Sequence, residues 1–372
     1  MKTIVLTGGG TAGHVLPHFA LLPHLRKHFD KIYYVGSHDG IERKLVEQQG
    51  LPFHGITCVK LRRSLSPKNV AKNLAIPFKL IKGIGEAKRL LQKLKPDVVF
   101  SKGGFVAYPV VRVAAKLGIP VIAHESDVSM GLANRMSVKF CDKVCTTFRQ
   151  TADSRQQTAE KFVHTGSPIR EQIYKGDRSI IDIRHKFTSG RNLLVIGGSS
   201  GAARINEAVR ATDLSKFNVI HISGRGKARG AELEYTDDIE NYLAWADIVV
   251  SRAGSNALCE LMVLGKAVLF IPLSTGRGDQ LDNVKEVLRL GAGAVLYEQD
   301  LNAELLHQGI EHVWTKRAEF SKNARKVVVD GTTEIVKTIV TVGAGLVPAQ
   351  IGTATGTRAG TRPAPTELSQ SN

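Results

Sequence analysis

The chain has 372 residues, of which 42% are hydrophobic and 23% charged, a composition typical of a globular protein long enough for two domains. No stretch approaches the roughly 20 uninterrupted apolar residues of a membrane span, which argues against an integral membrane protein. The formal net charge is +17, and residues 1–162 hold almost all of the excess, with 26 basic against 11 acidic residues. The electrostatic field of such a basic domain favours an anionic partner, which could be nucleic acid, anionic lipid or a phosphorylated substrate. The alternative is that the basic residues only make the surface soluble.

The N-terminus and the cysteines indicate a reducing compartment. Met1 and Lys2 lead directly into a strand-like, glycine-rich segment, which is unlike a signal peptide and predicts the cytoplasm. No CxxC spacing occurs, so we expect reduced, structural thiols at Cys58, Cys141, Cys145 and Cys259.

Strand-like apolar runs alternate with helix-like segments almost throughout the chain. This alternation predicts an α/β fold with parallel sheets covered by helices on both faces. In chain order the expected strands and their turns are TIVLT (3–7), KIYYVG (31–36), DVVFSKGG (97–104), PVIAHE (120–125), NLLVIGG (192–198), FNVIHISG (217–224), DIVVSRAG (247–254) and AVLFIP (267–272).

The pattern starts afresh in mid-chain. Residues 192–209 repeat the strand, glycine turn and helix of residues 2–21, which predicts two doubly wound domains with a ligand cleft at the carboxyl ends of their strands. We place the domains at 1–162 and 163–341. The last helix, 317–342, is either continuous or broken around Gly331, and it packs either on the second domain or back on the first. Residues 342–372 are rich in Gly, Ala, Thr and Pro and are expected to be disordered.

Two glycine-rich turns, GGGTAGH (8–14) and GGSSGAARIN (197–206), follow strands. Neither has the spacing of a dinucleotide fingerprint, so binding of NAD is disfavoured. Together they favour phosphate binding, because glycine lets backbone N–H groups approach phosphate oxygens at the positive end of a helix. A tight turn without a ligand is the alternative for either one. His14 on the first turn suggests that chemistry takes place there.

Polar residues follow three further strands. HESD (124–127) ends a strand, and its side chains serve either a ligand or each other. In SRAGSNALCE (251–260), Ser255 and Asn256 are expected to cap a helix, while Glu260 is either a ribose ligand or part of a capping box. The loop RGDQLDN (277–283) is polar in the way of loops that line sites.

Lysines flank apolar residues in the helix-like stretch 69–95. This pattern suits the surface of an anionic bilayer, where each nearby cation adds about 1 kcal/mol, although an amphipathic core helix is the alternative. With the basic excess of this half of the chain, we favour a peripheral membrane patch comprising Lys72, Leu74, Ile76, Phe78, Lys79, Ile81 and Lys82.

The order of these motifs, GGGTAGH, SKGGFVAYP, HESD, GLANR, TGSPIR, GGSSGAARIN, SRAGSNALCEL and RGDQLDNV, resembles the MurG family of peptidoglycan glycosyltransferases over residues 1 to about 340. The resemblance implies the GT-B fold, two Rossmann-like domains with an interdomain cleft. It implies an inverting transfer of N-acetylglucosamine from UDP-N-acetylglucosamine to the 4-hydroxyl of an undecaprenyl-pyrophosphoryl-muramyl-pentapeptide, at the cytoplasmic face of the cell membrane, without a cofactor or metal.

Other function classes fit less well. Another GT-B lipid glycosyltransferase, such as a galactolipid synthase, is the alternative enzyme. A nucleic-acid partner is not expected, because only 6% of residues are aromatic and no binding module is recognisable. A nonenzymatic nucleotide-binding regulator would leave His14 and the carboxylates at the strand ends unexplained.

The resemblance also implies roles for individual residues. His14 is the expected general base, with Glu125 as the alternative base or as its orienting partner, and His18 is expected to pack. The acceptor phosphates would lie at Gly103 and Gly104. Ala12 stands where the family commonly has a glycine. Residues implied for UDP-N-acetylglucosamine are Thr11, Ala12, Gly13, Asp127, Arg170, Ser199, Ser255, Asn256, Ala257, Leu258, Cys259, Glu260 and Gln280.

Overall fold

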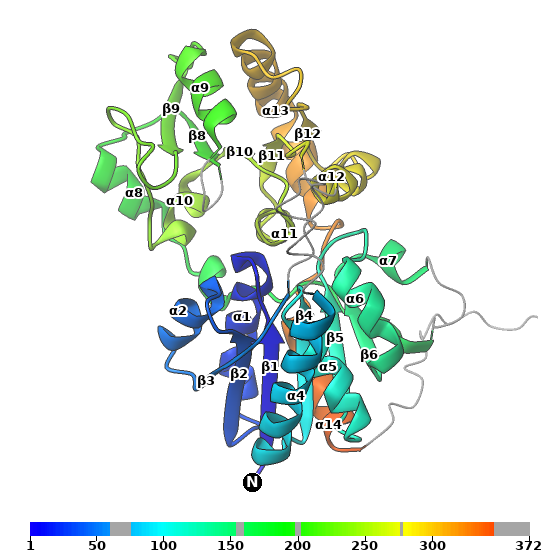
Figure 1. Cartoon of the computed structure of the whole chain (residues 1–372). Helices are drawn as coiled ribbons and strands as arrows, with labels where there is room; N and C mark the ends of the chain where they lie inside the picture. Colours follow the sequence, from blue (N-terminus) through cyan, green and yellow to red (C-terminus); the bar gives the residue numbers. More distant parts are fainter. Residues whose placement is uncertain (60–75, 154–159, 198–201, 276–277, 346–372) are drawn as a thin grey trace, which may run out of the picture.

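The computed structural model describes residues 1–59, 76–153, 160–197, 202–275 and 278–345. Two parallel sheets, each covered by helices on both faces, form two domains that lie one above the other (Figure 1). The first sheet has seven strands in the order β3-β2-β1-β4-β5-β6-β7, and the second has five in the order β12-β11-β10-β8-β9. The predicted α/β class with two doubly wound parallel-sheet domains is confirmed.

The first domain is built around strands that are buried on both faces, such as β1 and β4. Its strands are β1 (Thr3–Gly8), β2 (Lys31–Ser37), β3 (Phe53–Ile56), β4 (Val98–Gly103), β5 (Val121–Glu125), β6 (Lys143–Thr146) and β7 (Phe162–His164). Its helices are α1 (Leu16–Leu25), α2 (Ile41–Glu47), α4 (Ile76–Leu94), α5 (Ala107–Lys116), α6 (Leu132–Ser137) and α7 (Arg149–Asp153), and η1 (Ala12–His14) is a 3-10 turn.

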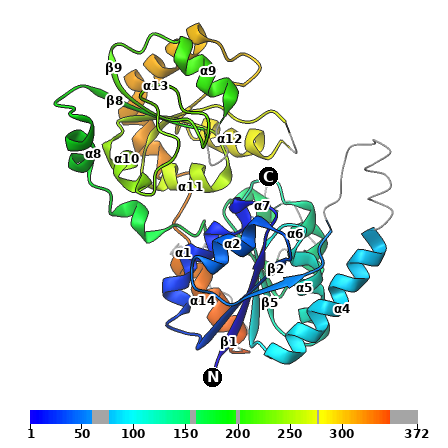
Figure 2. The ribbon, with the colours of Figure 1, turned by 60° about the vertical axis from the view of Figure 1, so that its left-hand side comes forward.

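The second domain repeats this plan around a smaller sheet. Helices α9 and α13 pack on one face, whereas α8, α10, α11 and α12 pack on the other. Figure 2 shows the helices of both domains around their sheets. The strands are β8 (Arg191–Ile196), β9 (Phe217–Ile222), β10 (Ile248–Ser251), β11 (Ala267–Phe270) and β12 (Ala294–Val295). The helices are α8 (Arg178–His185), α9 (Ala203–Ala211), α10 (Ile239–Trp245), α11 (Ser255–Val263), α12 (Asp279–Arg289) and α13 (Ala303–Ala324). The last helix of the chain, α14 (Thr332–Gly343), belongs instead to the core of the first domain.

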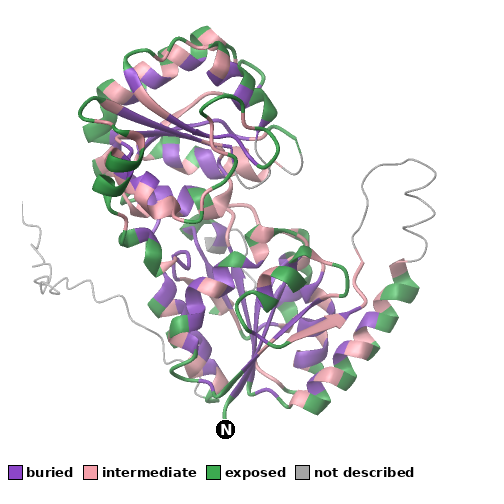
Figure 3. Ribbon diagram, turned by 90° about the vertical axis from the view of Figure 1, so that its left-hand side faces the viewer, coloured by how far each residue is buried: buried purple, intermediate pink, exposed green. Residues whose placement is uncertain are grey.

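Burial explains why the strands appear in the sequence as continuous apolar runs. A parallel strand covered on both faces has no polar side, and Figure 3 shows the central strands of both sheets as buried. Short strands without such a run, β3, β6, β7 and β12, were not predicted. They lie toward or at the edges of their sheets, where fewer apolar neighbours are needed.

The chain crosses between the domains twice, and both crossings refine the expected boundaries. Strand β7 continues to His164, two residues beyond the boundary expected at 162. The last helical segment is broken between α13 and α14, around Gly331 as one alternative had it, and α14 packs on α1 and β4 of the first domain. It continues to Gly343, so the tail expected from 342 begins later. Residues 346–372 lie outside the described part of the chain.

Candidate active site

The first glycine turn connects β1 to α1 at the carboxyl edge of the first sheet. Gly10 has a φ of +83°, in the region that favours glycine, whereas Ala12 forms the start of the 3-10 turn and has a negative φ. A side chain on Gly10 would lie 2.4 Å from the Phe105 ring. The alanine at position 12 is therefore compatible with the turn, because the conformational demand falls two residues earlier.

A buried carboxylate holds this turn in place. Glu42, fully buried at the start of α2, accepts hydrogen bonds from Gly10 N at 3.2 Å, Ser37 N at 2.8 Å and Ser37 Oγ at 2.6 Å. It thus ties the turn after β1 to the end of β2. Nothing in the local sequence marks Glu42 as a buried residue, since an acidic residue in the first turn of a helix is usually exposed.

The two histidines of the turn have different surroundings. His14 is half-buried, and its Nδ1 lies 2.9 Å from Thr11 Oγ1. His18 is completely buried between Tyr34 and Phe100, and burial lowers the pKa of His18 to about 3. His18 is therefore a neutral packing residue, as expected, and His14 is the histidine that a substrate could reach.

The second glycine pair of the first domain, Gly103 and Gly104, ends β4 beside the first turn. Both have positive φ, of +82° and +78°. A side chain at Gly104 would lie 2.3 Å from Gly9 O, and one at Gly103 would lie 2.6 Å from Asn134 Oδ1. Glycine is thus required at both positions, and the two turns lie against each other.

The HESD loop is organised by one carboxylate. Glu125 accepts hydrogen bonds from Ser126 N and Asp127 N through Oε1, and from Gly131 N and Asn134 Nδ2 through Oε2, at 2.9–3.2 Å. These four donors engage Glu125 with its own loop. The hydrogen bonds of Glu125 therefore fit the alternative in which the polar groups of this loop bond to each other and not to a ligand.

Helix α11 carries the predicted nucleotide segment of the second domain. Gly254 is the N-cap and no side chain caps the helix, so the predicted caps Ser255 and Asn256 are wrong in that role; both lie inside the first turn. Asn256 Nδ2 instead donates to Gly13 O in the other domain, at 3.3 Å. Leu258 and Cys259 are buried in the core of the second domain, which leaves only their backbone for a ligand.

Glu260 forms a bidentate ion pair with Arg170. Arg170 Nε donates to Oε1 at 2.7 Å and Nη2 donates to Oε2 at 2.9 Å. The pair lies beside the domain crossing at Ser167. Each carboxylate oxygen retains a lone pair, so Glu260 could still accept a hydroxyl of a ribose.

Asn283 makes a second contact between the domains. This fully buried side chain on α12 accepts from Val128 N at 3.1 Å and donates to Asp127 Oδ1 at 3.0 Å. Gln280, one turn earlier, accepts from Leu273 N at 2.9 Å and so fixes the loop after β11. Ser199 lies outside the described residues. The contacts of Asn256 with Gly13 and of Asn283 with Asp127 therefore join the two domains at residues predicted for UDP-N-acetylglucosamine, namely Gly13 and Asp127 of the first domain and Asn256 of the second.

The N-terminal part of α4 presents apolar and basic side chains to solvent. Phe78 is 77% exposed and Ile81 69% exposed, next to the exposed Lys79 and Lys82. The buried face of the helix is formed instead by Gly83, Ala87 and Leu91. Lys72 and Leu74 of the predicted patch lie outside the described residues, and Ile76 is half-buried. No helix in the described part of the chain has the length and hydrophobicity of a membrane span.

A cavity of about 730 Å³ opens beside the first glycine turn, at the ends of β2 and β3. Its walls are part apolar and part polar, and one wall is formed by α4. The cavity is lined by Gly10, Ser37, His38, Asp39, Gly40, Ile41, Ile56, Thr57, Cys58, Val59, Lys79 and Phe105.

Comparison with known proteins gives matches along nearly the whole chain. Residues 4–146 match the glycosyltransferase family 28 N-terminal domain and residues 192–339 the glycosyltransferase family 28 C-terminal domain. A protein of Lachnoclostridium phytofermentans named UDP-N-acetylglucosamine–N-acetylmuramyl-(pentapeptide) pyrophosphoryl-undecaprenol N-acetylglucosamine transferase is 46% identical, over 86% of this chain and 93% of its own. A protein of Legionella pneumophila with the same name is 40% identical, over 91% and 96%.

Among solved structures, the MurG of Acinetobacter baumannii is similar, with a TM-score of 0.72, 26% sequence identity and coverage of 91% of this chain and 99% of that one.

Proposed function

Because this chain belongs to glycosyltransferase family 28, among its MurG-type N-acetylglucosamine transferases, we propose that it transfers N-acetylglucosamine from UDP-N-acetylglucosamine to the lipid-linked muramyl-pentapeptide that its relatives' names specify. The second domain would hold the nucleotide sugar and the first the acceptor. The shared name of these relatives favours this reaction over that of a galactolipid synthase.

One contact between the domains supports the assignment of the nucleotide sugar to the second domain and of the acceptor to the first. Asn256, in the segment proposed for the nucleotide, donates to the backbone of Gly13, the neighbour of His14. A sugar held by α11 would thus lie next to the turn that carries the proposed base. Donor and acceptor sites that adjoin in this way support an in-line reaction, because the reacting atoms must approach to about 3–3.5 Å.

His14 has the position and the orientation of a general base. A proton on Nδ1 can be donated to Thr11 Oγ1, 2.9 Å away, and in that tautomer Nε2 carries the lone pair that would accept the proton of the acceptor's 4-hydroxyl. As that hydroxyl loses its proton to Nε2, its oxygen bonds to the anomeric carbon. The bond from that carbon to the UDP oxygen breaks, and the electron pair leaves with UDP. Glu125 is less suited to the role, because four donors already engage it.

The acceptor would reach the site from an anionic membrane surface. The exposed Phe78 and Ile81, with Lys79 and Lys82, support a peripheral attachment through the start of α4. The proposal therefore includes a location on the cytoplasmic face of the cell membrane. The cavity between α4 and the first glycine turn is available to the acceptor on its way to His14.

The test is transfer of radiolabelled sugar by the full-length protein. Incubation with UDP-N-acetylglucosamine and a short-chain prenyl-pyrophosphoryl-muramyl-pentapeptide should give a labelled lipid product. Parallel incubation with UDP-galactose and diacylglycerol should give none. Labelling of diacylglycerol with no transfer to the muramyl acceptor would overturn the proposal.

A further inference from the structure

A lysine is buried at the edge of the sheet where the acceptor is proposed to bind. Lys102, the residue before Gly103, is 2% exposed. Its Nζ lies 2.5 Å from His124 Nδ1 and 2.6 Å from Ser126 Oγ. Burying an ammonium group is costly unless it is paired, and both of these hydrogen-bond partners are neutral. Packing therefore does not explain why a charged residue occupies this position.

The protonation of His124 follows from its second contact. Its Nε2 lies 3.0 Å from Gly166 O, and a carbonyl oxygen can only accept, so Nε2 carries the proton and Nδ1 accepts from Lys102. Burial also keeps the pKa of His124 well below its ordinary value. Gly166 belongs to the crossing between the domains, where Ser167 N bonds to Val329 O. The ammonium is thus held by neutral groups in a network that reaches the crossing between the domains.

The charges that balance Lys102 are the carboxylates of the HESD loop. Burial lowers the pKa of Lys102 to about 8; Glu125 is the largest opposing influence on that pKa, followed by Cys259 and Asp127. Glu125 is held by four donors, and Asp127 by Asn283. Without the lysine, the HESD loop would lose this positive charge close to Gly103, which adjoins Asn134, the residue that donates to Glu125. A pyrophosphate is proposed to bind there.

We propose that Lys102 is a positioning residue that fixes the HESD loop and neutralises its carboxylates, so that this edge of the sheet can receive the pyrophosphate of the acceptor. This inference rests on the proposed function. It goes beyond that function in assigning acceptor affinity to a side chain that the substrate does not touch.

The first test replaces the charge and keeps the volume. In Lys102→Met, the KM for the acceptor should rise about tenfold or more, while the KM for UDP-N-acetylglucosamine changes little. In Lys102→Met/Asp127→Asn, which removes one carboxylate as well, the acceptor KM should recover most of the loss. An unchanged acceptor KM in the single variant, or no recovery in the double variant, would overturn the proposal.

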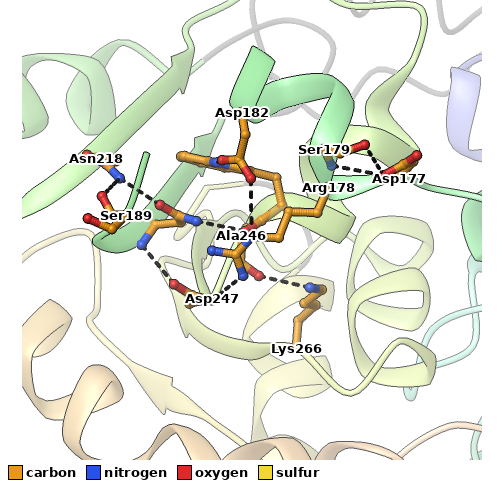
Figure 4. A network of polar contacts seen from close by, with 11 residues as sticks. Asp177, Arg178, Ser179, Asp182, Ser189, Asn218, Ala246, Asp247 and Lys266 are labelled. Carbon is orange, nitrogen blue, oxygen red and sulfur yellow. Dashed lines mark hydrogen bonds and ion pairs between the residues drawn. The ribbon is translucent and has the colours of Figure 1, made fainter. Parts of the chain in front are cut away.

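Lys266→Met is the matched control. Lys266 is a partly buried lysine whose pKa burial also lowers to about 8, but it lies in the second domain and donates to Ala246 O at 2.8 Å (Figure 4). Its replacement should lower the melting temperature without changing the acceptor KM. If Lys102→Met does not fold, Asp127→Asn alone decides: the acceptor KM should fall, and a KM that is unchanged or higher would count against the proposal.

Binding of farnesyl pyrophosphate, measured by titration calorimetry without a sugar donor, separates this proposal from the proposed reaction. Lys102→Met should weaken that binding about tenfold relative to the unmodified protein even if no sugar transfer were found. Equal affinities, or no binding by either protein, would overturn the role of Lys102.

Discussion

At the scale of single residues, the candidate chemistry depends on a few side chains that are oriented by their neighbours. Thr11 lies within hydrogen-bond distance of the Nδ1 of His14, and Arg170 holds both oxygens of Glu260. The orientations of His14, the proposed base, and Glu260, the proposed ribose ligand, are therefore set before any substrate arrives. Such preorganisation lowers the cost of reaching the reactive geometry.

Replacement of His14 tests the proposed base. His14→Ala should lower kcat about 100-fold or more, because proton abstraction from the acceptor hydroxyl loses its base, while the Kd for UDP-N-acetylglucosamine stays near that of the unmodified protein. Steady-state kinetics and donor titration measure the two quantities. His28→Ala, at an exposed position after α1, is the control and should leave both unchanged. An unaltered kcat in His14→Ala would assign the base to another residue.

Glu260 makes a separate prediction about the donor. In Glu260→Gln, the KM for UDP-N-acetylglucosamine should rise about tenfold, since a hydrogen bond from the ribose to a charged acceptor contributes about 1.5–3 kcal/mol. The acceptor KM should not change. Glu304→Gln, at an exposed position on α13, serves as the control. A rise confined to the acceptor KM would contradict the placement of the nucleotide.

The position of some site residues in the fold could be predicted from the sequence, whereas that of others could not. His14, Glu125 and Glu260 follow buried strands, so their place at the carboxyl edges could be predicted from local pattern. The burial of Glu42 and Lys102 could not, because it depends on which strands become neighbours. Likewise, the partner of Asn256 lies 243 positions away in the chain, and only the arrangement of the two domains reveals it.

At the scale of elements, the start of α4 should attach the protein to membranes. Phe78→Glu/Ile81→Glu should reduce cosedimentation with vesicles of anionic lipid by about tenfold or more, because two large apolar side chains no longer enter the interface. Activity on a water-soluble acceptor should persist. Ile183→Glu, at a position 78% exposed on α8, is the matched control. Equal sedimentation of the two variants would rule out this attachment surface.

The connection between α9 and the segment after β9 should be sensitive to acid. Both guanidinium contacts of Arg210 with Glu232 are 2.7 Å long, and this hydrogen-bonded pair lowers the pKa of Glu232 to about 2. The contribution of this ion pair to the stability of the folded protein is therefore complete above about pH 4.5 and is lost as the pH falls toward 2.

At pH 7, Glu232→Gln should lower the free energy of unfolding by about 2 kcal/mol, as measured by urea denaturation, and the difference should shrink below pH 4.5. The exposed neighbour Glu234 provides the control variant Glu234→Gln. A difference that is independent of pH would exclude this ion pair as its cause.

At the scale of the whole molecule, the two-sheet architecture could be predicted because every central strand carries its own apolar signature. The return of α14 to the first domain could not be decided from sequence, since its apolar face would suit either sheet. In the structure Ile335 and Ile339 complete the core over Ile4 and Leu6. The chain therefore crosses twice between the domains, which joins them more firmly than a single linker would.

The central claim is that the second domain presents a nucleotide sugar to a base on the first. A crystal structure of the protein with UDP-N-acetylglucosamine tests this most directly. We predict that the ribose lies against Glu260, the remainder of the nucleotide along Ser255 to Glu260, and the anomeric carbon on the side of His14. A nucleotide bound in the first domain, or a sugar directed away from His14, would contradict the account.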